Sequence, residues 1–313
     1  MDVTVVGAGV IGLTCALALE EAGHRVQVVA AATGAATTSS VAGAIWLPYR
    51  CGPADRVAVW AEATRRWLID VAARAPAAGV DVLTGYELTA DDERPWWAEA
   101  AGTVERVRAP VVGGVSAWRY VAPRVDPPPF LAWLTAQLAR PIERRVVADL
   151  AAEPGAAVIN CTGLGARALC ADEALVPLLG QVVVVAPGSL DRAVSIGDGR
   201  DPDATFYAIP RRTEIILGGC ALVWPADAPL VADPAITDRI LGHAARLGLV
   251  PGAQLEVRVA LRPFRPTVRL ERDAVTPRLI HCYGHGGAGF TLAHGCAAEV
   301  AALVAAAPAR ASY

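Results

Sequence analysis

The chain has 313 residues, 54% of them hydrophobic, and its 28 basic and 31 acidic residues leave a formal net charge of −3. This length is sufficient for two domains with sizeable cores. The near balance of charge excludes the basic surface that is typical of proteins that bind nucleic acid or anionic lipid, so we expect neither partner. Every basic residue is an arginine, which excludes a lysine Schiff base and a P-loop lysine.

The chain begins with an apolar strand that runs into a glycine-rich turn. Residues 3–6 predict a buried parallel strand, and residues 10–22, rich in Ala and Leu, predict a helix. Gly7, Gly9 and Gly12 form the pattern G-x-G-x-x-G, in which they allow a tight turn, close approach of a pyrophosphate and close helix packing. The other residues of the loop are Ala8, Val10 and Ile11. Its free N–H groups suit phosphates, so the pattern predicts a bound dinucleotide.

The elements that follow include both strands and helices. Expected strands cover residues 25–30, 157–161, 181–186, 205–210, 214–219, 254–261 and 279–283, and residues 33–44 form a loop of small and polar residues. A long helix is expected over residues 57–75, and a closing helix begins at about residue 292. Two more helices begin after Asp126 and Asp233, where proline occupies the first turn. These elements predict an α/β protein.

A second glycine-rich segment connects the last expected strand to the closing helix. Gly284, Gly286, Gly287 and Gly289 leave backbone N–H groups open at a second helix N-terminus. Such a positive end suits the pyrimidine side of an isoalloxazine, whose reduced form is anionic. Taken alone, the segment is explained equally well as an ordinary strand–helix turn. Two such loops at opposite ends of one chain favour a flavin over a nicotinamide.

The cysteines and histidines do not form a recognisable metal motif. The seven cysteines show no C-x-x-C pair and are spread through apolar stretches, as buried reduced cysteines are. His281 and His285 fall across a strand end and a glycine loop, so we expect no metal site. The N-terminus lacks the features of a signal peptide, and no uninterrupted apolar run has transmembrane length. The expected location is the cytoplasm.

Five short segments follow one another in a characteristic order. They are residues 41–49 (VAGAIWLPY), 160–163 (NCTG), 207–211 (YAIPR), 262–266 (RPFRP) and 283–287 (YGHGG). In this order they resemble the D-amino-acid oxidase family over nearly the whole chain. The resemblance implies an FAD-dependent enzyme that oxidises a D-amino acid to an imino acid. Water then hydrolyses the imino acid to a 2-oxo acid and ammonia, while O2 is reduced to H2O2.

The resemblance also implies a fold. A Rossmann-like FAD-binding domain is interleaved with a substrate domain that is built on a large antiparallel or mixed β-sheet. On this expectation residues 1–46, 120–185 and 262–313 form the FAD-binding domain, and residues 47–119 and 186–261 form the substrate domain. FAD is expected to bind without a covalent bond, and a homodimer is the expected assembly.

The family's cofactor-binding positions can be carried over onto matching residues of this chain. Thr37, Thr38 and Ser39 match a hydroxyl cluster along the flavin and its phosphates, although a polar turn would also explain them. Gly43, Ala44 and Ile45 match positions whose backbone approaches the isoalloxazine, and Val146 matches one whose backbone contacts the adenine. Thr162 matches a position near the cofactor. The C-terminal flavin-binding loop is matched by Gly286, Gly287, Gly289 and Thr291.

Two residues are the candidates for binding the substrate carboxylate and aligning the α-hydrogen. Arg262 is always charged and can make a paired, planar contact with a carboxylate, and Tyr207 can donate a further hydrogen bond. Both match the family's substrate-binding positions, and we include Gly287 with them. The alternatives are a fold-stabilising arginine and a half-buried strand tyrosine. No base is obviously placed, which agrees with the family mechanism, in which the α-hydrogen leaves as a hydride for flavin N5.

Some positions depart from the family pattern. The second strand ends in Ala30, Ala31 and Ala32, where an acidic residue would bind the adenosine ribose. Leu47 replaces a polar residue, Ala221 stands where many relatives carry a bulky aromatic residue, and Asp203 lies where some place a second tyrosine. Leu47 and Ala221 together predict a roomy, apolar pocket, and therefore neutral substrates with bulky or apolar side chains.

Two alternatives remain open from the sequence. A related flavin amine oxidase that acts on D-aspartate, glycine or sarcosine would share the cofactor and differ in the pocket residues. A nicotinamide-dependent dehydrogenase, or a flavin-binding protein without oxidase turnover, belongs to a different class.

Overall fold

Five parallel strands form one end of a large sheet in the computed structural model, which describes residues 1–201, 204–225 and 228–306. They are β1 Asp2–Val6, β2 Arg25–Ala30, β6 Glu143–Arg144, β7 Ala157–Asn160 and β14 Leu279–His285. β1 lies between β2 and β7. Val3 and Val5 face one apolar cluster and Val6 faces another, so β1 is buried on both faces, as strands of parallel sheets are.

The remaining strands continue the same sheet. They are β3 Val80–Leu88, β4 Glu105–Ala109, β5 Val115–Val125, β8 Val176–Val185, β9 Val194–Asp198, β10 Phe206–Pro210, β11 Ile215–Gly218, β12 Leu222–Val223 and β13 Gln254–Arg272. The strand order is β4-β5-β3-β9-β10-β11-β8-β13-β14-β7-β1-β2-β6, and β12 also pairs with β8. Neighbours in this second part are antiparallel, except that β3 and β9 are parallel. The long strand β13 joins the two parts, because it pairs first with β8 and then with β14.

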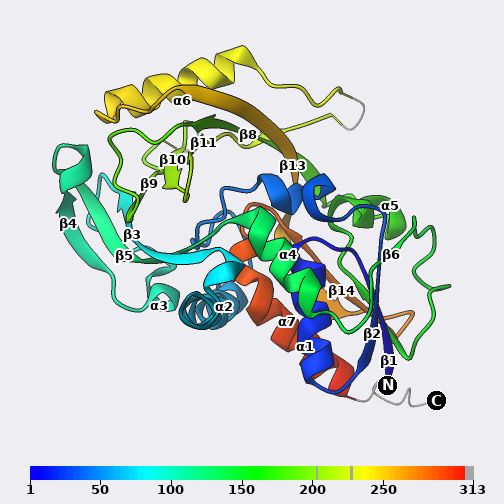
Figure 1. The fold of residues 1–313 in the computed structure, drawn as a ribbon. Coiled ribbons are helices and arrows are strands. Elements are labelled where there is room, and N and C mark those ends of the chain that lie inside the picture. The colour runs from blue at the N-terminus through cyan, green and yellow to red at the C-terminus, as the bar shows by residue number, and fades with distance from the viewer. Residues whose placement is uncertain (202–203, 226–227, 307–313) are drawn as a thin grey trace.

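The helices cover different regions of the sheet (Figure 1). They are α1 Val10–Glu21, α2 Ala54–Arg74, α3 Ala98–Ala101, α4 Pro127–Gln137, α5 Ala166–Leu169, α6 Pro234–Arg246 and α7 Gly289–Ala305, together with the short 3₁₀ helices η1 Gly34–Ala36, η2 Thr38–Val41, η3 Pro76–Ala78, η4 Pro110–Val112 and η5 Gly163–Gly165. α7 packs against both α1 and α2, while α6 lies along β8 at the other end of the molecule (Figure 1). Gly295 of α7 allows close packing, since a Cβ atom there would be 2.3 Å from the Trp60 carbonyl oxygen of α2.

The fold class predicted from the sequence is confirmed, because the chain is a mixed α/β protein with one large mixed sheet. The predicted helices after Asp126 and Asp233 are α4 and α6. The Asp233 carboxylate accepts a hydrogen bond from the Ala235 N–H, which stabilises the start of α6. The division into two domains stays a prediction, and its boundary between residues 261 and 262 falls inside β13.

Three predicted strands are too short by more than one residue. The strand expected over residues 181–186 begins at Val176 in β8, and the strand expected over residues 279–283 continues to His285 in β14. The strand expected over residues 254–261 continues to Arg272 in β13. Pro266 is an unexpected residue inside this strand, because proline lacks the N–H that a strand ladder needs. In the fold, Pro266 lies where the pairing of β13 with β14 is irregular, between Phe264 and Arg269. The ladder is interrupted there, so the strand tolerates the proline.

Other strands are not indicated by the sequence pattern, because glycine interrupts them. Gly85 in β3 lies under the ring of Tyr120, and Gly197 in β9 lies under the carboxylate of Glu87. In sequence such a glycine resembles a break, but in the sheet it makes room for a side chain from a neighbouring strand. Two local expectations also need correction: the loop over residues 33–44 contains η1 and η2, and α7 begins at Gly289 rather than at residue 292.

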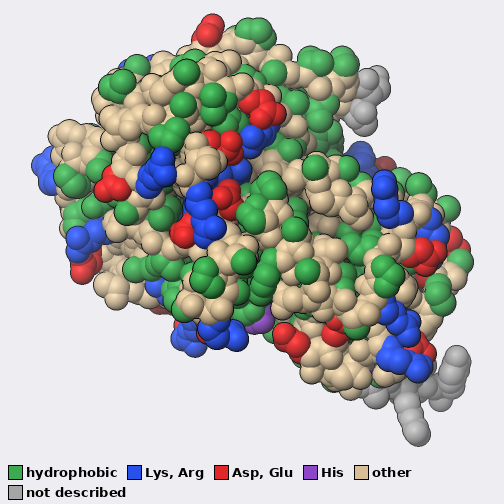
Figure 2. Space-filling model, in the orientation of Figure 1, with side chains coloured by type: hydrophobic (Ala, Val, Ile, Leu, Met, Phe, Trp, Pro, Cys, Tyr) green, Lys and Arg blue, Asp and Glu red, His purple; other side chains and the backbone are tan. Residues whose placement is uncertain are grey.

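Charges of both signs are mixed on the surface. On the face shown in Figure 2, arginine and acidic side chains lie next to one another rather than gathering into a patch of one sign. Among the ion pairs of the chain, Arg66 with Glu62 and Arg74 with Asp70 each lie within one helix. In the described ranges, no helix combines the length and the hydropathy that a membrane span requires.

Candidate active site

The first glycine loop connects β1 to α1, and its packing explains each glycine. Gly7 has a φ of 117°, and a Cβ atom there would be 2.3 Å from a carbonyl oxygen just beyond β7. A Cβ atom at Gly12 would be 1.9 Å from the Gly7 carbonyl oxygen. Gly9 precedes the first turn of α1, where the Val10 N–H donates a 3.0 Å hydrogen bond to Ser39 Oγ. The loop therefore packs tightly and contacts Ser39, one of the predicted cofactor-binding hydroxyl residues.

The second glycine loop lies between β14 and α7. Gly284 and Gly286 have φ values of 88° and 54°, which favour glycine. Gly287 lies between two side chains, since its Cβ atom would be 3.2 Å from Tyr49 Cδ1 and 3.6 Å from Arg262 Cδ. A side chain at residue 287 would therefore press on the arginine that the sequence singled out.

Both loops line one cavity of about 890 Å³. The predicted cofactor-binding residues in its lining are Gly7, Ala8, Gly9, Val10, Ile11, Thr37, Thr38, Ser39, Gly43, Ala44, Val146, Thr162, Gly286, Gly287 and Gly289. Gly12 and Thr291 lie outside the lining. Thr291 is buried, and its hydroxyl donates to the Leu47 carbonyl oxygen at 3.1 Å, which ties α7 to the segment before Tyr49. The contacts of all these residues with a cofactor stay predictions.

One face of the sheet forms another wall of the cavity and carries the two predicted substrate-binding side chains. Tyr207 on β10 is opposite Gly218 on β11, where a Cβ atom would be 2.5 Å from the tyrosine hydroxyl oxygen. Arg262 on β13 lies over Gly180 on β8, where a Cβ atom would be 2.6 Å from Arg262 Cζ. Because β11 and β8 are neighbours, the phenol and the guanidinium approach each other over them.

The two groups suit a carboxylate ligand. Arg262 Nη1 donates to the carbonyl oxygens of Cys220 at 2.5 Å and Leu179 at 3.5 Å, which holds the guanidinium in place. Its other N–H groups can bind a carboxylate in the paired geometry that arginine favours. Burial raises the pKa of Tyr207, and the nearby charge of Arg262 offsets this only in part. The phenol is therefore neutral and can donate a hydrogen bond.

Sequence reasoning missed several polar residues that line the same cavity, among them Tyr49, Glu87, Tyr120 and Ser195. Tyr49 ends the segment 41–49, so its place there was a signal that could have found it. The other three lie on β3, β5 and β9, whose strands the sequence pattern did not indicate. Only the pairing of distant strands brings them to the cavity.

The residues expected to form the side-chain pocket are not all at the cavity. Leu47 lines it, whereas Ala221 does not. Ala221 follows Gly219 and Cys220, which do line it, and leads into the exposed strand β12. Asp203 lies outside the described residues. The expectation of an apolar pocket therefore rests on Leu47 alone.

The end of β2 lacks the acidic residue that usually accompanies the glycine fingerprint. Ala30, Ala31 and Ala32 line the cavity instead. Arg145 lies in the lining beside Val146, but carboxylates hold it: it donates to Glu153 at 2.7 and 2.6 Å and to Glu143 at 2.7 Å. The usual acidic partner of the adenosine ribose is therefore missing from this part of the wall.

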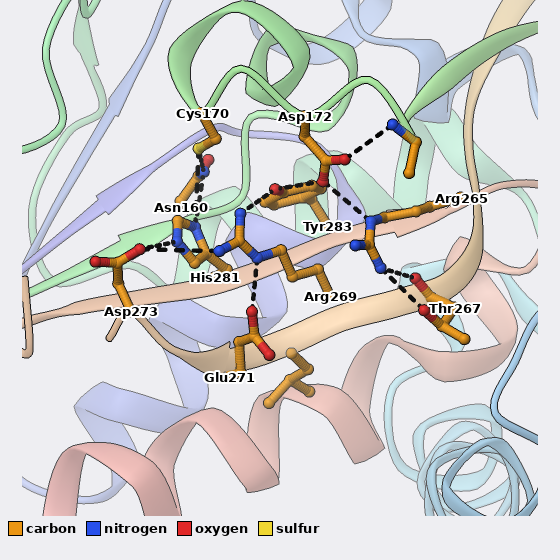
Figure 3. Close-up of polar contacts among 12 residues, drawn as sticks. Asn160, Cys170, Asp172, Arg265, Thr267, Arg269, Glu271, Asp273, His281 and Tyr283 are labelled. Atoms are coloured by element: carbon orange, nitrogen blue, oxygen red, sulfur yellow. Dashed lines mark hydrogen bonds and ion pairs between the residues drawn. The ribbon is translucent and has the colours of Figure 1, made fainter. Parts of the chain in front are cut away.

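A polar network supports the strand that leads into the second glycine loop (Figure 3). The Tyr283 hydroxyl donates to Asp172 at 2.8 Å and accepts from Arg269 at 2.8 Å. Arg265 also donates to Asp172, at 3.0 Å. Because Tyr283 precedes Gly284 and the Arg265 side chain packs against that glycine, the network fixes the start of the loop.

Several cysteines come together in the core behind the cavity. Ligand atoms of Cys15, Cys161 and Cys282 lie within 4.8 Å of one another, and those of Cys282, His285 and Cys296 form a second such group. All five side chains are buried. Their spacing along the chain does not indicate this cluster, because the residues come from different helices and strands. Reduced cysteines pack in this way as small apolar side chains.

The fold and the cavity define a class of protein. A G-x-G-x-x-G turn after a central parallel strand opens onto the same cavity as a second glycine loop and as Tyr207 and Arg262, which suit a carboxylate. This combination suits a flavin-dependent oxidoreductase. The family model described as DAO, FAD dependent oxidoreductase, matches residues 2–303. The chain belongs to this family, and its cofactor is FAD.

Known relatives cover nearly the whole chain. It is 41% identical over 320 residues to the D-amino-acid oxidase of Rubrobacter xylanophilus, with 97% of this chain and 95% of that protein covered. It is 38% identical over 313 residues to the D-amino-acid oxidase of Streptomyces coelicolor, with 96% of each covered. The solved structure of glycine oxidase from Geobacillus kaustophilus is similar with a TM-score of 0.79 at 19% identity, covering 97% of this chain and 94% of that one. At this identity the similarity shows the fold alone.

The residues present fit FAD. The cavity extends from Ala30 and Val146 to Tyr207 and Arg262, so it suits an elongated dinucleotide. Gly7 and Gly9 line it at the start of α1, and Gly289 lines it at the start of α7, where helix N-termini favour anionic groups.

Proposed function

We propose that this chain is a D-amino-acid oxidase, which converts a D-amino acid, O2 and water into a 2-oxo acid, ammonia and H2O2. The observation that supports this most is the pair Tyr207 and Arg262, which meet on the sheet face opposite the glycine loop at residue 287 and suit a carboxylate. The identity of 38–41% to D-amino-acid oxidases of two bacteria supports the same reaction.

Positioning is the part of the reaction that this chain's own residues supply. Bound FAD would supply the acceptor for the hydride of the substrate Cα and the route by which the electrons reach O2. Arg262 and Tyr207 bind the substrate carboxylate and so fix the direction of the Cα–H bond. Gly287 leaves space for the substrate beside Arg262, because it has no side chain. No protein base is required at Cα, since the α-hydrogen leaves with its electron pair.

The cofactor residues follow the length of the cavity in this proposal. The loop of residues 7–12, with Ser39, binds the pyrophosphate, and Val146 lies beside the adenine. Gly43, Ala44 and the loop of residues 286–289 bind the isoalloxazine. O2 as the electron acceptor, a homodimeric assembly and a cytoplasmic location belong to the same proposal.

The cavity gives little support to an acidic substrate such as D-aspartate. A second side-chain carboxylate needs a second cation, and among the described residues the arginines that line the cavity are Arg262 and Arg145. Arg145 is held by carboxylates at the far end of the cavity. Arg211, close to Tyr207 in sequence, is buried elsewhere and pairs with Asp126 at 3.4 Å and Glu214 at 3.1 Å.

Peroxide formation tests the proposal. The purified protein, saturated with FAD, should form H2O2 with several D-amino acids and with none of their L-enantiomers. A panel of D-amino acids that yields no peroxide would contradict the proposal. A preparation that stays colourless after added FAD would favour a nicotinamide enzyme, and a yellow protein without turnover would favour a flavin-binding protein.

A further inference from the structure

One carboxylate in the cavity, away from Arg262 and Tyr207, accepts a backbone hydrogen bond from Gly199 but keeps one oxygen atom without a partner. Glu87 on β3 lines the cavity and is half-buried. Its Oε2 atom is buried and has no hydrogen-bond partner in the described part of the chain. Buried carboxylate oxygens are normally hydrogen-bonded or paired, because removing them from water is unfavourable. An oxygen of this kind in the wall of a substrate cavity indicates that its partner is a ligand.

Strand pairing places Glu87 in one row with Tyr207. Glu87 on β3 is opposite Gly197 on β9, and Gly197 is opposite Tyr207 on β10. Tyr207 is in turn opposite Gly218 on β11. Residues that are directly opposite in a sheet point to the same face. Glu87 and Tyr207 therefore share the cavity face, and neither glycine places a side chain between them.

The distance between the two functional groups follows from the same row. A Cβ atom at Gly197 would be 1.9 Å from Glu87 Oε2, and one at Gly218 would be 2.5 Å from the Tyr207 hydroxyl oxygen. Both groups therefore lie directly over these glycines, which are two strand spacings apart. At about 4.8 Å per spacing, the carboxylate and the hydroxyl are about 10 Å apart. An amino acid whose carboxylate is bound at Tyr207 can reach Glu87 only with a long side chain.

The charge around Glu87 favours a cation. The charged group that faces it is Asp198 on β9, which is itself paired with Arg200 at 2.8 Å and His243 at 2.9 Å. Burial, together with the charge of Asp198, raises the pKa of Glu87 to about 8. Tyr120 on β5 is buried and, because its own pKa is raised, neutral. A positive group placed against Glu87 would compensate both the burial and the repulsion.

We propose that Glu87 binds the cationic end of a basic D-amino acid side chain, a guanidinium or a terminal ammonium, while Arg262 and Tyr207 bind the α-carboxylate. The inference rests on the proposed function, because it assigns the side-chain subsite of that reaction. Ser195, two residues before Gly197 on the same face of β9, lines the cavity beside this subsite. D-amino acids with basic side chains are therefore the preferred substrates, in contrast to the preference for apolar side chains that Leu47 predicted.

Substrates that differ only in side-chain charge test this proposal. D-arginine is compared with its neutral isostere D-citrulline, in the wild-type holoenzyme and in Glu87→Gln. The wild type should prefer D-arginine. Glu87→Gln should lower kcat/KM for D-arginine by about 10- to 100-fold, mainly through KM, because one charged hydrogen bond is lost. The value for D-citrulline should change by less than about threefold.

The control is Glu62→Gln, which makes the same change on α2, where the side chain is 45% exposed. It should leave both substrates unaffected. Equal use of D-arginine and D-citrulline by the wild type would overturn the proposal without any variant, and so would an unchanged D-arginine preference in Glu87→Gln. The absence of turnover with every D-amino acid would instead contradict the proposed function.

Discussion

Replacing Arg262 with methionine should remove the cation that we propose to bind the substrate carboxylate, while keeping most of the apolar stem. The guanidinium already donates through Nη1 to the Cys220 carbonyl oxygen at 2.5 Å, so its orientation is fixed before substrate binds. Two remaining N–H groups can bind the two carboxylate oxygens. Each charged hydrogen bond contributes about 1.5–3 kcal/mol, so their loss amounts to about 3–6 kcal/mol. At about 1.4 kcal/mol per factor of ten, kcat/KM should fall by about 10²- to 10⁴-fold.

The assay measures peroxide formation by the FAD-saturated variant over a range of D-amino acid concentrations. FAD binding is followed separately by visible absorption and should be unchanged, because Arg262 lies on β13 over Gly180 and not beside the pyrophosphate loop. Arg66→Met, on α2 with a side chain that is 74% exposed, is the matched control. A value of kcat/KM for Arg262→Met within threefold of wild type, with FAD bound, would show that the carboxylate is bound elsewhere.

Three further variants test the loops and the buried acid. Gly12→Ala should abolish stable folding or FAD binding, because its Cβ atom would be 1.9 Å from the Gly7 carbonyl oxygen; thermal unfolding checks this, and a wild-type Tm would refute it. Tyr283→Phe should lower the free energy of unfolding by about 1–3 kcal/mol, since Asp172 and Arg269 each lose a partner; urea unfolding measures the difference. Because the pKa of Glu87 is raised from 4.5 to about 8, the folded state binds more protons than the unfolded state between these values, and its stability falls as pH rises through this window. Glu87→Gln should remove this loss. The free energy of unfolding of the variant, relative to that of wild type, should therefore rise by about 2 kcal/mol or more between pH 5 and pH 9. If the free energies of unfolding of the two proteins change in parallel with pH, the pKa of Glu87 is not raised.

The parts of the fold that depend on local pattern could be predicted from the sequence. The glycines at residues 7, 9 and 12 follow an apolar run and precede an Ala- and Leu-rich helix, and β1, α1 and β2 form there. The second loop could be predicted for the same reason, since its glycines stand between an apolar strand and the last helix. In both cases the signal is local, because the strand, the glycines and the helix follow one another directly in the sequence.

The parts that depend on distant strands could not be predicted. Gly85 and Gly197 interrupt the strand pattern in the sequence, yet in the sheet they make room for Tyr120 and Glu87. The sequence pattern therefore does not indicate the strands that carry the acidic end of the cavity, and it predicts the side-chain pocket from Leu47 and Ala221. Ala221 is outside the lining of the cavity. Glu87 becomes visible as a candidate only when β3, β9 and β10 are seen to pair.

Anaerobic reduction of the bound flavin is the most direct measurement of whether this chain oxidises D-amino acids. The FAD-loaded protein is mixed without oxygen with D-arginine, and then, in a fresh sample, with L-arginine. The visible flavin absorption should be lost with the D-enantiomer, persist with the L-enantiomer and return when oxygen is admitted. Flavin absorption that persists with D-arginine and with every neutral D-amino acid would contradict the assignment.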